Sequence, residues 1–147
     1  MQTDSGAAES REVRFTLVNR ISEIDRLHQE IKSAEVRLGL PEEVGLACVL
    51  ALEEIVINII NYGYDDEAEH LIEIRLEVLS AGEIRLTVQD DGRSFNPLLS
   101  HEPDTNSPLE ERPVGGLGIH IVKKMMDNVR YEHRGDRNIL TLVRYAR

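Results

Sequence analysis

The chain has 147 residues, of which 41% are hydrophobic, a formal net charge of −10 and a single cysteine. This length fits one domain with a substantial core, and the negative charge argues against a nucleic-acid or anionic-membrane partner, because both need a basic face. Cys48 has no second cysteine with which to form an internal disulfide, which fits a reducing, cytoplasmic location.

A polar arm and a first strand open the chain. Residues 1–11 are small and polar and are expected to form a disordered arm, which leaves 12–147 as a single domain. Apolar and polar residues then alternate over 13–17. This alternation is typical of a short strand with one buried face.

Two helices are expected next. Apolar residues recur every three or four positions over 21–38, and Asn19 or Ser22 is placed to cap that helix. The second predicted helix covers 41–62, with a proline in its first turn and Gly63 as its stop signal.

The second half of the chain predicts two hairpins separated by a long loop and a helix. Alternating patterns over 72–78 and 84–88 predict the first hairpin, and the second lies within 129–144. Four prolines among acidic and polar residues make 93–114 a solvated segment of the length typical of a lid. A helix is expected over 116–126. Helices segregated from antiparallel hairpins indicate an α+β two-layer sandwich, with a mostly antiparallel mixed sheet and helices on one face.

A polar stripe interrupts the apolar second helix. Glu54, Asn58 and Asn61 fall on one face at helical spacing. Because a buried carboxylate without partners is costly, the stripe needs a solvent edge, an internal hydrogen-bonded pair or a cavity that holds something polar. In the last interpretation, Glu54 accepts a proton and the amide oxygen of Asn58 ligates a hard cation such as Mg²⁺. The polar residues and the short apolar run, 44–60, argue against a membrane span.

Two glycine motifs follow, each with two interpretations. Asp90-Asp91-Gly92 is either a turn or a site where Asp90 accepts a hydrogen bond from an exocyclic amine while Gly92 admits a flat ring. Gly115-Gly116-Leu117-Gly118 is either a hinge or a phosphate site made by backbone N–H groups at a helix start. The surroundings of these glycines match neither the dinucleotide fingerprint nor the phosphate-loop ending.

Taken in order, these motifs resemble a known family. Glu54-x-x-x-Asn58, Asp90-x-Gly92 and Gly116-x-Gly118 look like the N, G1 and G2 boxes of the Bergerat-fold ATP-binding superfamily, which includes the histidine kinases. The small size of the domain is similar to that of the anti-sigma-factor serine/threonine kinases. The resemblance covers roughly 13–144 and implies the Bergerat type of α+β sandwich.

The resemblance also implies roles for individual residues. Glu54 would be the general base toward a protein serine or threonine hydroxyl, and Asn58 would ligate the Mg²⁺ that bridges the ATP phosphates. Asp90 would recognise the adenine amine, with Gly92 under the ring. Arg112 would neutralise charge on the transferred phosphoryl group. The remaining cofactor-binding residues would be Asn61, Gly115, Gly116, Leu117 and Gly118.

The implied function is that of a cytoplasmic, ATP-dependent protein kinase. Its substrate would be a small anti-sigma-factor antagonist of the STAS type, its second partner a sigma factor, and relatives of this kind often form homodimers. Ser94 stands where the family has a second glycine, and the threonine that many relatives place near the C-terminal hairpin is not evident around Asn138. These departures favour an alternative, a nucleotide-sensing binding module without catalysis. A third interpretation is a structural interaction domain whose three motifs coincide by chance.

Overall fold

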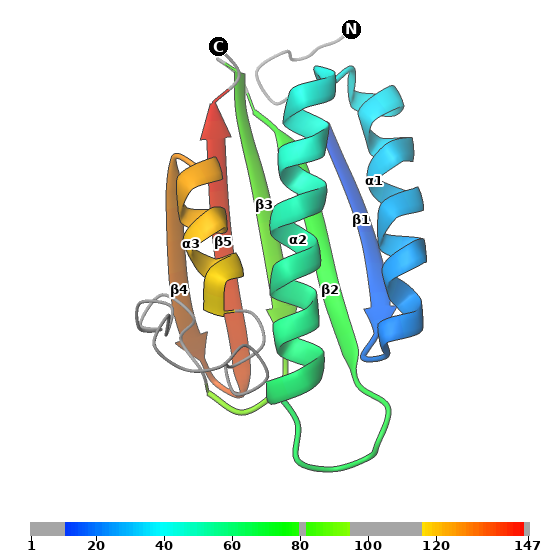
Figure 1. Cartoon of the computed structure of the whole chain (residues 1–147), viewed down its shortest axis with the longest axis vertical. Coiled ribbons are helices and arrows are strands. Elements are labelled where there is room, and N and C mark those ends of the chain that lie inside the picture. The colour runs from blue at the N-terminus through cyan, green and yellow to red at the C-terminus, as the bar shows by residue number, and fades with distance from the viewer. Residues whose placement is uncertain (1–10, 80–81, 95–115, 146–147) are drawn as a thin grey trace, which may run out of the picture.

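A five-stranded sheet with helices on one of its faces forms the computed structural model of the chain (Figure 1). The structure describes residues 11–79, 82–94 and 116–145. The strands are β1 (Arg11–Val18), β2 (Leu71–Val78), β3 (Glu83–Asp90), β4 (Asn128–Arg134) and β5 (Arg137–Tyr145). The helices are the 3₁₀ turn η2 (Ile21–Glu23), α1 (Ile24–Leu38), α2 (Glu42–Tyr62) and α3 (Gly116–Met125).

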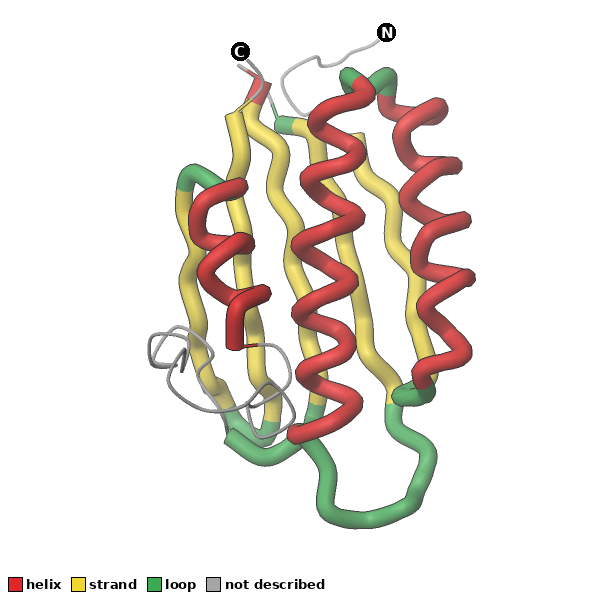
Figure 2. The backbone as a smooth tube through the Cα atoms, in the orientation of Figure 1, coloured by secondary structure: helices red, strands yellow, loops and turns green. Residues whose placement is uncertain are grey.

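The strand order of the sheet is β1-β2-β3-β5-β4. The predicted α+β two-layer class is confirmed, and Figure 2 shows its helix layer lying over its strand layer. The sequence predicted a mostly antiparallel mixed sheet, whereas all four strand pairings in the described ranges are antiparallel. The β4–β5 hairpin turns at Gly135, whose φ of 66° is left-handed and free of strain in glycine.

Alternating apolar residues give the sheet its buried face. Successive side chains of a strand point to opposite faces, so each strand sends every second residue toward the helices. One row that crosses the whole sheet on this face consists of Phe15, Ile74, Val88, Leu140 and Tyr131. Helix α1 contributes to the core the buried residues of one helix face, which recur every three or four positions: Leu27, Ile31, Ala34 and Leu38.

The opposite face of the sheet carries charged and polar side chains. Residues directly opposite each other on β1 and β2 have like charge, as Glu12 faces Glu77 and Arg14 faces Arg75. Ion pairs therefore run along each strand, from Arg14 to Glu12 and from Arg75 to Glu77. This pattern keeps the uncovered face hydrophilic while its like-charged neighbours remain compensated.

Helix α2 lies in the middle of the helix layer, between α1 and α3 (Figure 1). Its inner side is fully buried at Cys48 and Leu52, because almost every residue of this stretch is apolar, as the sequence predicted. Its outer side is exposed at Leu46. Among the described residues, no helix combines the length and the apolar character needed to cross a membrane.

The predicted caps of the first helix are wrong. Helix α1 begins at Ile24 after the 3₁₀ turn, and no side chain caps the start of either. The side-chain oxygen of Asn19 instead accepts the backbone N–H of His70 at 2.9 Å, and the Asn19 N–H donates to the His70 carbonyl at 3.0 Å. The Asn19 side chain, which local spacing assigned to the helix start, therefore forms a tertiary contact between the end of β1 and the start of β2 instead.

The predicted arm, 1–11, and the predicted lid, 93–114, lie largely outside the described residues. Arg11 is already part of β1, which begins two residues before the predicted strand, 13–17. Only the first two residues of the lid segment, Arg93 and Ser94, are described.

Leu52 provides a direct test of the packing of α2. Its side chain has 0% exposure, so Leu52→Ala is expected to lower the free energy of unfolding by about 2–5 kcal/mol, measured by urea denaturation. Leu46→Ala is the matched control on the same helix. Since Leu46 is 57% exposed, this change is expected to stay within about 0.5 kcal/mol. Equal losses in the two variants would contradict the orientation of α2.

Candidate functional site

A pocket opens between the C-terminal half of α2 and the neighbouring ends of β3, β4 and β5. Its walls are largely apolar, and polar side chains converge on it from α2, β3 and β5. The lining residues are Ile55, Asn58, Ile59, Gly63, Val88, Asp90, Arg93, Tyr131, Asn138 and Leu140. An apolar cleft with a few convergent polar groups is the usual form of a small-molecule site.

Two polar atoms of α2 are buried without hydrogen-bond partners in the described part of the chain. They are Oδ1 of Asn58, a residue with 6% exposure that lines the pocket, and Oε2 of Glu54, one helical turn earlier. Burial raises the pKa of Glu54, and the neighbouring Glu53 carboxylate raises it further. Orphaned buried oxygens are rare and call for a partner. A cation and a polar ligand fit them, since carboxamide oxygens are good ligands for a hard cation.

Asp90 ends β3 at the floor of the pocket and is 5% exposed. Its Oδ1 accepts the Gly92 N–H at 2.8 Å and an N–H of the Asn138 side chain at 3.0 Å. Burial raises the pKa of Asp90, whereas these two hydrogen bonds act in the opposite direction. A desolvated carboxylate held by two donors is a rigid acceptor, suited to recognise an N–H group of a ligand.

Gly92 is needed for a close backbone contact. A Cβ on this residue would lie 2.6 Å from the carbonyl oxygen of Gly63, at the end of α2. The turn is held there because the Arg93 N–H donates to that carbonyl at 2.9 Å and Arg93 Nε donates to the Tyr62 carbonyl at 2.7 Å. The sequence predicted that Gly92 makes room for a ring. In the structure, the absence of a side chain at Gly92 instead allows the turn after β3 to pack against the end of α2.

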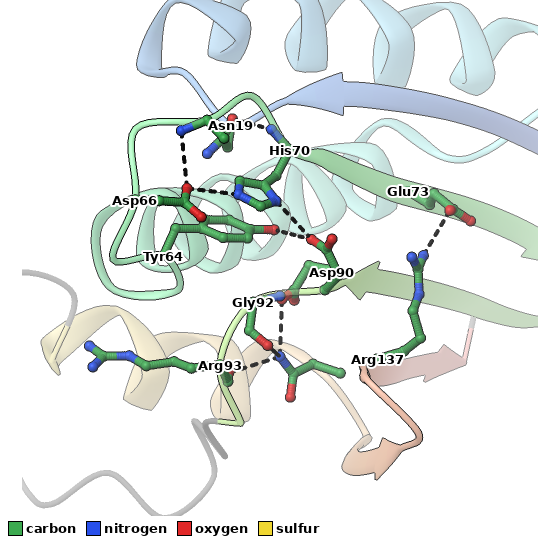
Figure 3. A network of polar contacts seen from close by, with 12 residues as sticks. Asn19, Tyr64, Asp66, His70, Glu73, Asp90, Gly92, Arg93 and Arg137 are labelled. Atoms are coloured by element: carbon green, nitrogen blue, oxygen red, sulfur yellow. Dashed lines mark hydrogen bonds and ion pairs between the residues drawn. The ribbon is translucent and has the colours of Figure 1, made fainter.

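A second polar network joins the loop after α2 to the end of β3 (Figure 3). The rings of Tyr64 and His70 stack with centroids 4.1 Å apart, and the Tyr64 hydroxyl donates to Asp91 at 3.2 Å. His70 lies between two carboxylates, with Nε2 2.9 Å from Asp66 and Nδ1 3.3 Å from Asp91. The hydrogen bond to Asp66 is the main cause that raises the pKa of His70. Nothing local in the sequence indicated this network.

Asn138 is the main site residue that sequence analysis missed. It is the register partner of Asp90 across β3 and β5, and it is 7% exposed. A signal was present, because the turn at Gly135 and the alternation of Leu140 and Leu142 put residue 138 on the buried face. An asparagine at such a position needs polar partners.

The structure brings together only part of the predicted site. Asn58 and Asp90 line the pocket, whereas Asn61 is exposed on the last turn of α2. Gly116, Leu117 and Gly118 form the first turn of α3. The predicted Arg112 and Gly115 lie outside the described residues. Within the described ranges, no group of three or more His, Cys, Asp and Glu side chains is arranged to hold a metal ion.

Comparison with known proteins decides the family. Residues 17–144 match the histidine kinase-like ATPase domain. The chain belongs to this family. The resemblance inferred from the three motifs is thereby confirmed, and an ATPase domain implies that the chain binds ATP.

Several relatives of this ATPase domain have names that describe an activity. The chain is 31% identical over 94 residues to the serine-protein kinase RsbW of Bacillus cereus (strain B4264), an alignment that covers 57% of this chain and 54% of that protein. It is 23% identical over 118 residues to the anti-sigma F factor of Heyndrickxia coagulans, covering 80% of this chain and 79% of the relative. The chain thus spans about half the length of the kinase it matches.

A solved structure shares the fold of the ATPase domain. The crystal structure of the RsbU and RsbW domains of Rv1364c from Mycobacterium tuberculosis superposes with a TM-score of 0.65. The match covers 92% of this chain and 32% of that one, at 15% identity. At this identity the likeness supports the fold alone.

The orphaned carboxylate of Glu54 is expected to affect the stability of the protein. Its pKa in the folded protein is raised above the ordinary 4.5, so ionised Glu54 destabilises the fold at neutral pH. Glu54→Gln is therefore expected to raise the free energy of unfolding at pH 7. The gain shrinks as the pH falls through the raised pKa and is absent below about 4.5, where both states are protonated. Urea denaturation at several pH values measures it.

Glu53→Gln is the matched control for this measurement. Glu53 lies 3.1 Å from His28 of α1 and is only the lesser cause of the raised pKa of Glu54, so removing its charge is expected to bring a smaller gain. A destabilising effect of Glu54→Gln at pH 7 would mean that this carboxylate has a stabilising partner in the folded protein.

The network around His70 predicts a different pH dependence. Because the folded-state pKa of His70 is raised above 6.5, its contribution to stability is fully present below that pH and is lost as the pH rises through the raised value. The wild type is thus expected to have a higher free energy of unfolding than His70→Gln, and this difference is expected to be larger at pH 6 than at pH 8. An NMR titration of the His70 ring checks the pKa directly, and Asp66→Asn is expected to lower it. A pKa at or below 6.5 in the wild type would contradict the network.

Proposed function

We propose that the chain is an ATP-dependent protein-serine/threonine kinase of the anti-sigma-factor type. The observation that carries this proposal is the pair of orphaned oxygens on Glu54 and Asn58, one helical turn apart beside the pocket that ends at Asp90. A carboxylate and a carboxamide in this arrangement fit a general base and a cation ligand.

Each side chain of the site has a part in the proposed reaction. Asp90 would bind the base of ATP, and Asn58 would ligate the Mg²⁺ on its phosphates. Bound Mg·ATP supplies the activated γ-phosphoryl group. Glu54 would take the proton of a serine or threonine hydroxyl. The hydroxyl oxygen would form a bond to the γ-phosphorus as the bond between that phosphorus and ADP breaks. Because the pKa of Glu54 is raised, it lies closer to neutral pH, and a general base is most effective when its pKa is near the working pH.

The names of two relatives support the choice of substrate class. One is called a serine-protein kinase and another an anti-sigma F factor. On this ground we propose an anti-sigma-factor antagonist of the STAS type as substrate, a sigma factor as second partner, a homodimeric assembly and a cytoplasmic location. Arg112, Gly115 and the closing of segment 93–114 over the nucleotide remain predictions of the sequence.

One observation favours the second candidate, a nucleotide-sensing module that binds without transfer. Glu54 does not line the pocket formed by the described residues, although Asn58 does. A carboxylate outside the pocket can stay idle while the nucleotide binds.

Phosphotransfer with matched variants separates the two functions. With labelled ATP, Mg²⁺ and candidate STAS-type antagonists, the wild type is expected to form phosphoserine or phosphothreonine. Glu54→Gln is expected to reduce the rate by about 10²- to 10⁴-fold while calorimetry shows unchanged ATP binding. Asn58→Ala is expected to lose the Mg²⁺-dependent part of the binding. Glu53→Gln, which removes the adjacent carboxylate, is expected to retain transfer.

Three outcomes would change the proposal. Tight binding that depends on Asp90, without transfer to any antagonist, would favour the binding module. Equal transfer by the wild type and Glu54→Gln would remove Glu54 from the reaction. The absence of ATP binding would remove both candidate functions.

A further inference from the structure

The Asn138 side chain is the centre of the densest polar network at the pocket. Its Nδ2 lies within hydrogen-bond distance of three acceptors, at 3.0 Å from Asp90 Oδ1, 3.0 Å from the Arg93 carbonyl and 3.2 Å from the Gly92 carbonyl. Its Oδ1 accepts the Tyr131 hydroxyl and lies 3.1 Å from Nδ1 of His133. The orientation of the carboxamide is therefore determined, since the flipped form would turn its oxygen toward three other oxygens.

This network decides which oxygen of Asp90 remains for a ligand. Oδ1 already receives two donors, the Gly92 N–H and the Asn138 N–H, and a carboxylate oxygen has two lone pairs. A third donor is poorly accommodated there. A ligand N–H must therefore approach Oδ2, whose direction is set by the two bonds on Oδ1.

The same side chain holds the segment that leaves β3. On one side of this segment, Asn138 of β5 lies against the carbonyls of Gly92 and Arg93. On its other side, the Gly63 carbonyl at the end of α2 accepts the Arg93 N–H at 2.9 Å. Asn138 thus connects the sheet to α2 through this segment, at the point where the floor and one wall of the pocket meet.

We propose that Asn138 is a positioning residue that sets the selectivity of the pocket for a 6-aminopurine nucleotide over a 6-oxopurine nucleotide. Through its bond to Oδ1 it orients Oδ2 of Asp90 toward the amine, and it fixes the adjoining backbone. The inference rests on the proposed binding of ATP, and it names the side chain on which the choice of base depends. A 6-oxo group would place an acceptor against the carboxylate, which has no proton to donate.

Removal of Asn138 is expected to weaken this selectivity in a pH-dependent way. The Asn138 bond lowers the pKa of the buried Asp90, so its loss raises that pKa. As the pH falls, a protonated Asp90 can donate to a 6-oxo group. The other ionisable groups near Asp90 are Asp91 at its own strand end, Arg137 on β5 and Tyr64 after α2. Two more residues, Arg93 and His133, contact Asn138 itself.

The test compares the affinities of ATP and inosine triphosphate by calorimetry between pH 6 and pH 8. Inosine carries a 6-oxo group and an N1–H where adenine has a 6-amino group and an unprotonated N1. The wild type is expected to prefer ATP at every pH. Asn138→Ala is expected to bind ATP about 10- to 100-fold more weakly, which is the effect of losing a hydrogen bond to a charged group. Its preference for ATP over inosine triphosphate is expected to fall as the pH is lowered. Asn138→Thr keeps one donor for Asp90, so it is expected to retain more of the preference than alanine does.

A control variant separates the loss of Asn138 from a change in the histidine beside it. His133 is exposed and near the oxygen end of the carboxamide, so His133→Gln is expected to leave the pH profile of the preference unchanged. Thermal unfolding of each variant verifies that it is folded, and Asn138→Thr carries the comparison if the alanine variant does not fold.

The outcomes distinguish this inference from the proposed function. A wild type that binds neither nucleotide contradicts ATP binding itself. A wild type that prefers ATP, with both folded Asn138 variants equally selective at all pH values, overturns the role of Asn138 alone. A His133→Gln profile that matches that of Asn138→Ala overturns it as well, because the pH dependence would then not be specific to the loss of Asn138.

Discussion

The close approach of two backbone segments holds the site together. At Gly92 the turn after β3 comes so near the end of α2 that a methyl group would collide with the Gly63 carbonyl. The hydrogen bond from Arg93 to the same carbonyl fixes the distance between sheet and helix. Asn58 belongs to that helix and Asp90 to that strand, so the relation between them depends on this contact.

The polar groups of the pocket fall into two classes. Asp90 and Asn138 hydrogen-bond to each other and to the neighbouring backbone, so this end is held in place before any ligand arrives. Glu54 and Asn58 keep buried oxygens without partners in the described chain. Rigid groups suit recognition of a flat base, because little order is lost on binding. Unpaired oxygens suit an ion and a reacting hydroxyl, which supply the missing partners.

Local patterns predicted most of the fold, and two of the predicted site residues, Asn58 and Asp90, line the pocket. Alternation and helical spacing found the strands and helices because each pattern reflects one buried face, as Leu52 and Phe15 illustrate. The cap at Asn19 failed because His70, distant in sequence, takes its side chain. The alternation of Leu140 and Leu142 marks Asn138 as buried, but its role was missed because its partners come from β3 and β4. Contacts between distant segments leave no mark in the spacing of residues.

The single thiol in the first half of α2 provides a built-in probe of local opening. Cys48 is fully buried, and burial raises the pKa of its thiol to about 12, so in the folded protein it is both shielded and protonated. A thiol reagent can react with it only when α2 separates from the sheet. The rate of that reaction therefore reports how often the helix that bears Glu54 and Asn58 detaches, without any label introduced into the chain.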